Sequence, residues 1–112
     1  MEDRYLFKGK EKDSGKWLEW NVMEGIPHNV TILTNTICQC TGLKDKNGKL
    51  IWENDVVKIN NSKVNTLITF RDFEIICTIP NEKYYKHRLE YDTEYEVIGN
   101  IFDNPELLES EG

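Results

Sequence analysis

The stretch TGLKDKNGKLIWENDVVKI, residues 41–59, is the most informative part of this chain. It contains two apolar runs, a charged tight turn between them, and a second polar break at Glu53-Asn54-Asp55. The pair Asn47-Gly48 predicts a β-hairpin, because both residues tolerate the positive φ angles of a type I′ turn. The polar break predicts a second turn, after which an apolar strand resumes. We therefore expect this stretch to fold the chain back on itself twice.

The first turn also resembles the beginning of a calcium-binding loop, D-x-N-G, starting at Asp45. Lys49 stands where the next acidic ligand would be, and no Glu occupies the twelfth position of such a loop. We therefore predict a structural turn here and no metal site.

Alternating apolar residues predict strands along most of the remaining chain. The expected strands cover residues 4–8, 17–23, 29–42, 63–70, 73–80 and 95–102, with a hairpin between the fourth and the fifth. Gly99 predicts a bulge or a close approach within the last strand. Asn104-Pro105-Glu106 predicts the start of a short helix. The expected fold class is therefore all-β, or at least β-dominated, with a short C-terminal helix.

Length and composition indicate one domain. A chain of 112 residues is too short for two domains of ordinary size, and it is long enough to fold without disulfides or metal. The three cysteines are an odd number in a chain whose N-terminus does not resemble an export segment, so we expect reduced thiols. No stretch approaches the ~20 apolar residues of a membrane span. These features predict a cytoplasmic protein.

The net charge of −6 is unevenly distributed. Residues 90–112 hold eight acidic residues and no Lys or Arg, whereas the preceding 89 residues hold 14 basic and 12 acidic ones. The acidic end is either a solvated tail that keeps the protein in solution or a face for a basic partner.

Two blocks of sequence, QCTGLKDKNGKLIWENDVV and YEVIGNIFDNPELLE, resemble the YopX family, small proteins from phages and prophages of Gram-positive bacteria. The matching residues are Thr41, Gly42, Leu43, Asp45, Asn47, Gly48, Trp52, Glu53 and Asp55 in the first block, and Val97, Ile98, Gly99, Asn100, Ile101, Asn104, Pro105 and Leu107 in the second. Asn54 stands where the family usually has glycine. Since Asn is the next most tolerant of positive φ, we expect the turn to be kept.

The resemblance implies a small YopX-like barrel, partly SH3-like, with an extra N-terminal β element. Within a single domain over residues 1–112, it implies that element over 1–41, a barrel-like core over 42–104, and a short helix with an acidic tail over 105–112. It also implies a phage or prophage origin and no established enzymatic activity.

No motif of catalysis or cofactor binding stands out. Cys38 and Cys40 would lie on one face of a strand, but the usual zinc spacings are absent, so we expect them to face the core as small hydrophobic residues. Cys77 lies in an apolar run and is expected to be buried and inert. GxSxG, P-loop and dinucleotide motifs are absent. We predict a protein that is not an enzyme and needs no cofactor.

The candidate nucleic-acid contact is a basic and aromatic hexapeptide, Lys83, Tyr84, Tyr85, Lys86, His87 and Arg88. Aromatic rings stack on bases and cations meet phosphates, and Lys44, Lys46 and Lys49 at the hairpin would extend such a patch. The alternative is an edge strand or loop with solvated cations, which the overall negative charge favours.

Trp17 is the candidate for a subunit interface. If residues 17–23 form a strand, Leu18, Trp20 and Val22 share its inner face and Trp17 points the other way. Trp17 is then either covered by another layer or available to a partner subunit. We expect a non-enzymatic accessory protein that binds another macromolecule, as a homo-oligomer and with a host or phage protein as a further partner. A nucleic-acid-binding module is the alternative.

Overall fold

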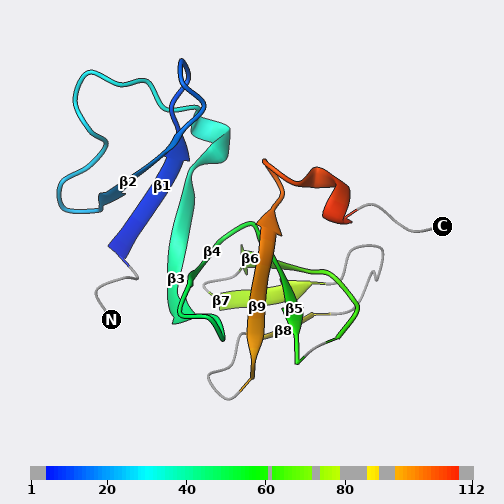
Figure 1. The fold of residues 1–112 in the computed structure, drawn as a ribbon. Coiled ribbons are helices and arrows are strands. Elements are labelled where there is room, and N and C mark those ends of the chain that lie inside the picture. The colour runs from blue at the N-terminus through cyan, green and yellow to red at the C-terminus, as the bar shows by residue number, and fades with distance from the viewer. Residues whose placement is uncertain (1–4, 61, 72–73, 79–85, 89–92, 109–112) are drawn as a thin grey trace.

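The computed structural model describes residues 5–60, 62–71, 74–78, 86–88 and 93–108, and within them the fold is all-β (Figure 1). The strands are β1 Leu6–Lys10, β2 Trp17–Asn21, β3 Cys38–Lys44, β4 Leu50–Trp52, β5 Asp55–Ile59, β6 Thr66–Arg71, β7 Glu74–Thr78, β8 Lys86–Arg88 and β9 Tyr95–Asn100. They form two antiparallel sheets, ordered β2-β1-β3-β4 and β8-β7-β6-β5-β9. The predicted fold class is therefore confirmed.

The hairpin between β3 and β4 is also confirmed, but its turn is not of type I′. Gly48 has a φ of +82°, whereas Asn47 is not among the residues with positive φ. The Gly48 amide donates to the Asp45 carbonyl at 3.0 Å, and the Asp45 amide donates to the Lys49 carbonyl at 2.7 Å. This pattern is typical of a three-residue hairpin loop that ends in a left-handed glycine. Only the glycine therefore needs the positive φ.

The second turn carries the chain from one sheet to the other. Asn54 has a φ of +72°, as expected for a position usually held by glycine. Its amide donates to the Ile68 carbonyl at 2.7 Å, and its own carbonyl accepts from the Ile101 amide at 3.1 Å. The turn thus ties the start of β5 to β6 and to the segment after β9.

The strand predicted over residues 29–42 is wrong in its first half. The strand begins only at Cys38, and Thr34–Thr36 form a short 3-10 helix, η2. The Thr36 hydroxyl accepts from the Lys10 amide at 2.8 Å and donates to the Leu33 carbonyl at 2.6 Å. A buried threonine that bonds to its own turn and to β1 outweighs the β propensity of its neighbours. The predicted C-terminal helix is likewise a 3-10 helix, η3, Pro105–Leu108.

Gly99 occupies a close approach, as predicted. The register between β5 and β9 shifts, so that Val56 opposes Gly99 while Val57 opposes Val97. A Cβ atom at Gly99 would lie 2.5 Å from the Asn104 Oδ1 and 2.7 Å from a Leu107 methyl carbon. Glycine therefore lets η3 pack directly against β9.

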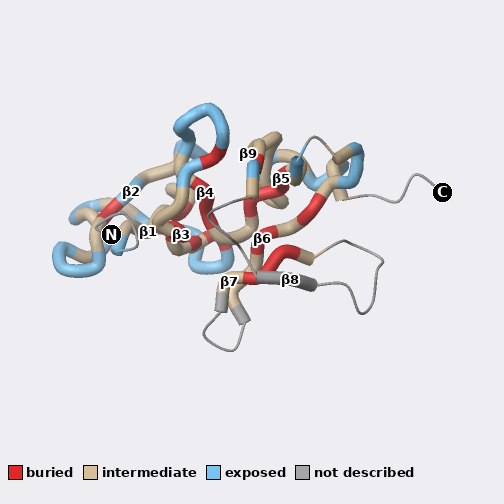
Figure 2. Tube along the Cα trace, turned by 90° about the horizontal axis from the view of Figure 1, so that it is seen from below, coloured by how far each residue is buried: buried red, intermediate tan, exposed pale blue. Residues whose placement is uncertain are grey.

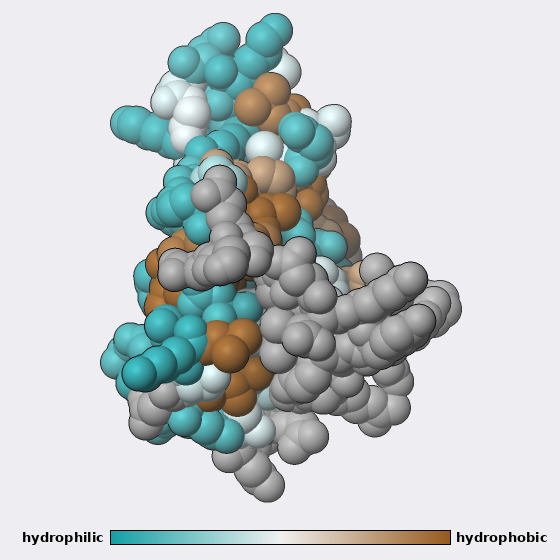
Figure 3. Space-filling view, turned by 90° about the vertical axis from the view of Figure 1, so that its right-hand side faces the viewer, coloured by the Kyte–Doolittle hydropathy of each residue, from teal (hydrophilic) through white to brown (hydrophobic). Residues whose placement is uncertain are grey.

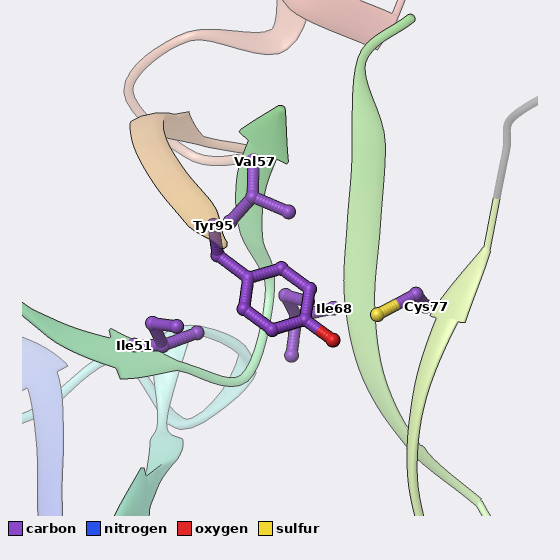
Figure 4. Packing of buried hydrophobic residues seen from close by; sticks show 5 residues of the cluster. All are labelled: Ile51, Val57, Ile68, Cys77 and Tyr95. Atoms are coloured by element: carbon purple, nitrogen blue, oxygen red, sulfur yellow. The ribbon is translucent and has the colours of Figure 1, made fainter. Parts of the chain in front are cut away.

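Two hydrophobic clusters form the core. The larger contains Ile51, Val57, Ile68, Cys77 and Tyr95, which converge from four strands of the second sheet and from β4 (Figure 4). The smaller contains Cys38, Cys40 and Trp52. All three cysteines are buried thiols outside any disulfide, which confirms the expectation that they pack in the core. Along the chain, burial concentrates in β3 to β7, and the exposed residues lie mainly in the loops (Figure 2).

The hydropathy of the surface changes along the molecule. On the face that Figure 3 presents, hydrophilic residues cover the upper end and hydrophobic ones gather at mid-height. The upper end corresponds to the β1–β2 turn, where residues 12–16 are all exposed.

Candidate functional site

The turn residues that the sequence singled out have structural roles. Asp45 is buried and its carboxylate accepts three backbone hydrogen bonds, from the amides of Asn47, Lys49 and Val97, each at 2.9 Å. Burial by itself would raise the pKa of Asp45, but these three bonds outweigh it and the pKa is lowered. Gly42 has a φ of +85°, so its backbone also requires a glycine-like residue. These residues shape the turns.

Asp55 combines a structural role with an unusual titration. Its Oδ2 accepts from the Trp52 amide at 2.8 Å and closes the second turn. The residue is only 4% exposed, and burial raises the pKa of the carboxyl from 3.8 to about 6, against the opposing effects of the Trp52 amide and of Lys8. A buried carboxylate of this kind is a candidate for function as well as for turn formation.

The raised pKa of Asp55 predicts that the protein is less stable at neutral pH than at mildly acidic pH. The folded chain binds a proton at Asp55 more readily than the unfolded chain does. The free energy of unfolding therefore increases as the pH falls through about 6 towards 3.8. Between pH 7.5 and pH 5 we expect the free energy of unfolding to rise by about 1 kcal/mol relative to Asp55→Asn, in which the amide oxygen can still accept from Trp52. Urea unfolding of both proteins at the two pH values tests this. Parallel pH profiles would contradict it.

The basic and aromatic hexapeptide lies largely beyond what the structure describes. Residues 83–85 fall outside the described residues, and residues 86–88 form β8, an edge strand of the second sheet. Lys44 and Lys46 are exposed at the β3–β4 hairpin, and the Lys46 Nζ lies 3.8 Å from the Glu96 carboxylate. The nucleic-acid contact therefore stays a prediction.

Trp17 packs within its own chain. Its ring meets the Phe102 ring edge-on at 5.9 Å, and its indole Nε1 donates to the Asp103 carboxylate at 2.9 Å. Lys8 and Lys10 place their Nζ atoms 4.5 Å and 5.4 Å from the indole centroid. These contacts within the chain leave Trp17 half-buried, and its part in a subunit interface stays a prediction.

An exposed apolar surface, which was not predicted from the sequence, lies where β1 begins and β2 ends. Tyr5, Val22, Met23 and Ile26 are 57%, 51%, 88% and 46% exposed, and we call these four residues the apolar tip. Val22 was expected on the inner face with Leu18 and Trp20, and that expectation is wrong. A hollow of about 630 Å³ beside β2 is lined by Asn21 and the first three of these residues.

The local backbone explains why the tip faces outward. The Asn21 carbonyl accepts from the amides of Glu24 and Gly25, and the Asn21 side chain accepts from the Met23 amide at 2.7 Å. β2 therefore ends at Asn21 in a tight turn, so the alternation does not continue to Val22. The Val22 amide donates to the Tyr5 carbonyl at 2.9 Å, which brings both ends of the hairpin together. The sequence marker is the apolar pair Val22-Met23 in an otherwise polar turn.

The described residues contain no group of three or more His, Cys, Asp or Glu side chains arranged to hold a metal ion. None of the helices in the described part of the chain is long and apolar enough to cross a membrane.

Comparison with known proteins agrees with the motifs. No curated protein matches the sequence. The model of one family, described as YopX protein, matches residues 2–109 and so covers nearly the whole chain, including both turns, Gly99 and the apolar tip. The chain belongs to the YopX family.

Proposed function

We propose that this protein is not an enzyme and acts by binding other protein chains, including copies of itself, through the apolar tip. The observation that carries the proposal is the exposure of four large apolar side chains at one end of the β1–β2 hairpin. Burying such side chains contributes roughly 25 cal/mol per Å² of apolar area, which favours association. Their grouping distinguishes them from Leu33 and Val64, which are exposed in other parts of the chain.

The tip adjoins an edge of the first sheet. Among the described strands β2 is the outermost of that sheet, and edge strands can pair with another chain. However, Glu19 is exposed at the centre of β2, so two copies paired antiparallel about this residue would bring like charges together. We therefore place the contact between copies at the tip, and not along the full length of β2.

The test is the mass of the protein in solution. We expect the wild type to sediment as a homo-oligomer at about 10 µM, an affinity that corresponds to roughly 7 kcal/mol. Met23→Lys should give a monomer, because it inserts a charge into the contact. Val64→Lys is the matched control: it changes an exposed apolar residue away from the tip and should leave the mass unchanged. A monomeric wild type, or equal effects of both variants, would reject the self-association.

A second proposal is that the protein binds nucleic acid through residues 83–88. It is supported by the position of Lys86–Arg88 in β8, the outermost strand of the second sheet within the part of the chain that the structure describes. Changing Lys83, Lys86 and Arg88 together to Glu should abolish a salt-dependent affinity for single-stranded DNA or RNA. Changing three exposed acidic residues to Gln is the control for general charge effects. Binding that is absent even at about 50 mM salt would reject this function.

Both proposals agree with an accessory role for a phage or prophage protein in the cytoplasm of a bacterial host. Such a role depends on binding a partner and does not require a catalytic centre. Protein recovered from infected or induced cells, with and without nuclease treatment, would show whether partner capture depends on nucleic acid.

A further inference from the structure

A cleft of about 510 Å³ opens between the two sheets, separate from the apolar tip. Lys8 and Glu19 contribute from β1 and β2, Lys49 from the β3–β4 loop, Trp52 from β4, and residues 97–100 from β9. Asp55 also lines it and, as described above, is almost fully buried. The cleft therefore combines the Trp52 ring with two lysines and two carboxylates, one of them buried and the other exposed.

Neither carboxylate is neutralised by a salt bridge within the described residues. Asp55 uses Oδ2 for the Trp52 amide, and its Oδ1 makes no hydrogen bond to a described residue. Glu19 lies directly opposite Lys8 in the β1–β2 register, yet the two form no ion pair. Unpaired carboxylates beside an indole make a favourable environment for a cation, since charge attraction and cation–π contact act together.

Lys8 shows that the Trp52 ring already accepts a cation. Its Nζ lies 4.5 Å from the Trp17 ring centroid and 4.8 Å from that of Trp52. The ammonium therefore rests on the indoles in preference to Glu19. A guanidinium group is better suited than an ammonium to the remaining space, because it is planar, stacks on aromatic rings, and donates two parallel hydrogen bonds to a carboxylate.

We propose that this cleft binds the arginine side chain of a partner polypeptide, with the guanidinium between Asp55 and the Trp52 ring and with Glu19 at the rim. The site is independent of the apolar tip, so either can fail without the other. The charged groups that face Asp55 are Lys8 from β1, and Lys49 and Asp45 from the β3–β4 loop. Because the pKa of Asp55 is about 6, its protonation would compete with the cation in mildly acidic solution.

The probe is Nα-acetyl-arginine amide, titrated into the full chain and followed by NMR shifts of the Trp52 indole and the Gly99 amide. We expect saturable binding at pH 7.5, about tenfold weaker affinity at pH 5, and at least tenfold weaker affinity in Asp55→Asn. Nα-Acetyl-citrulline amide, a neutral analogue of the same shape, should not bind. Lys8→Met should tighten binding, because it frees the indole faces.

Several results would overturn the proposal. These are the absence of saturation, equal binding of the citrulline analogue, and an affinity that is unchanged in Asp55→Asn. If Asp55→Asn does not fold, two other measurements test the proposal. It requires weaker binding in Glu19→Gln, and weaker binding by the wild type at pH 5 than at pH 7.5. Methylguanidinium lacks a peptide backbone and should bind more weakly than the arginine amide. Equal affinity would assign the cleft to small cations and reject a polypeptide partner.

Discussion

Replacing Asp45 by alanine is expected to lower the free energy of unfolding by about 3 kcal/mol. The carboxylate accepts from three backbone amides, and each net hydrogen bond contributes about 1 kcal/mol, with a larger cost where a buried donor loses its partner. Two of these donors belong to the hairpin loop itself. The third, Val97, is on β9 in the other sheet, so the substitution both loosens the loop and separates it from β9.

Urea unfolding followed by tryptophan fluorescence measures this loss, and hydrogen exchange of the Val97 amide locates it. Asp13→Ala is the matched control, because Asp13 is an exposed residue of the β1–β2 turn and should change stability by less than about 0.5 kcal/mol. The lowered pKa of Asp45 adds a pH test. Its stabilisation is present above the unfolded pKa of 3.8 and is lost as the pH falls through the lower folded value. If Asp45→Ala lowers the free energy of unfolding by less than about 1 kcal/mol at pH 7, water accepts these hydrogen bonds in place of the carboxylate.

Ile51→Ala is expected to lower the free energy of unfolding by about 2 to 5 kcal/mol. Ile51 lies on β4 of the first sheet but is fully buried in the cluster formed by the second sheet (Figure 4). Truncating it leaves a cavity where the two sheets meet. Because the side chain belongs to both, we expect one cooperative transition, and not independent melting of each sheet.

Tryptophan fluorescence and hydrogen exchange together measure whether the two sheets unfold in one transition. Trp17, Trp20 and Trp52 all lie in strands of the first sheet, so their fluorescence reports on that sheet and on the contacts of Trp17 with Phe102 and Asp103. Hydrogen exchange of the Ile68 amide follows the second. Both probes should give the same loss of stability in Ile51→Ala, whereas Val64→Ala, at an exposed position, should change neither. A loss confined to one probe would show that the sheets unfold separately.

Features that depend on neighbouring residues could be predicted from the sequence. Alternation and the Asn-Gly pair were sufficient for the β3–β4 hairpin, and a glycine within a strand predicted a bulge or a close approach at Gly99. The positive φ of Asn54 agrees with the turn that the family resemblance implied. The burial of Cys38 and Cys40 follows from period-two patterning. Predictions from the local pattern were wrong at two places where a turn changes the direction of the chain. The Thr36 hydroxyl stabilises η2 within a β-rich stretch, and the turn at Asn21 exposes Val22.

Contacts between residues far apart in the sequence depend on how the strands are arranged in space. Asp45 reaches Val97 across 52 positions, and Trp17 reaches Asp103 across 86. The cleft exists because Lys8, Asp55 and Gly99, from three separate strands, line one space. No periodicity encodes such pairings, because side-chain alternation specifies which face a residue occupies but not which strand of another sheet lies opposite. The candidate binding surfaces of this YopX protein are therefore properties of how its two sheets pack.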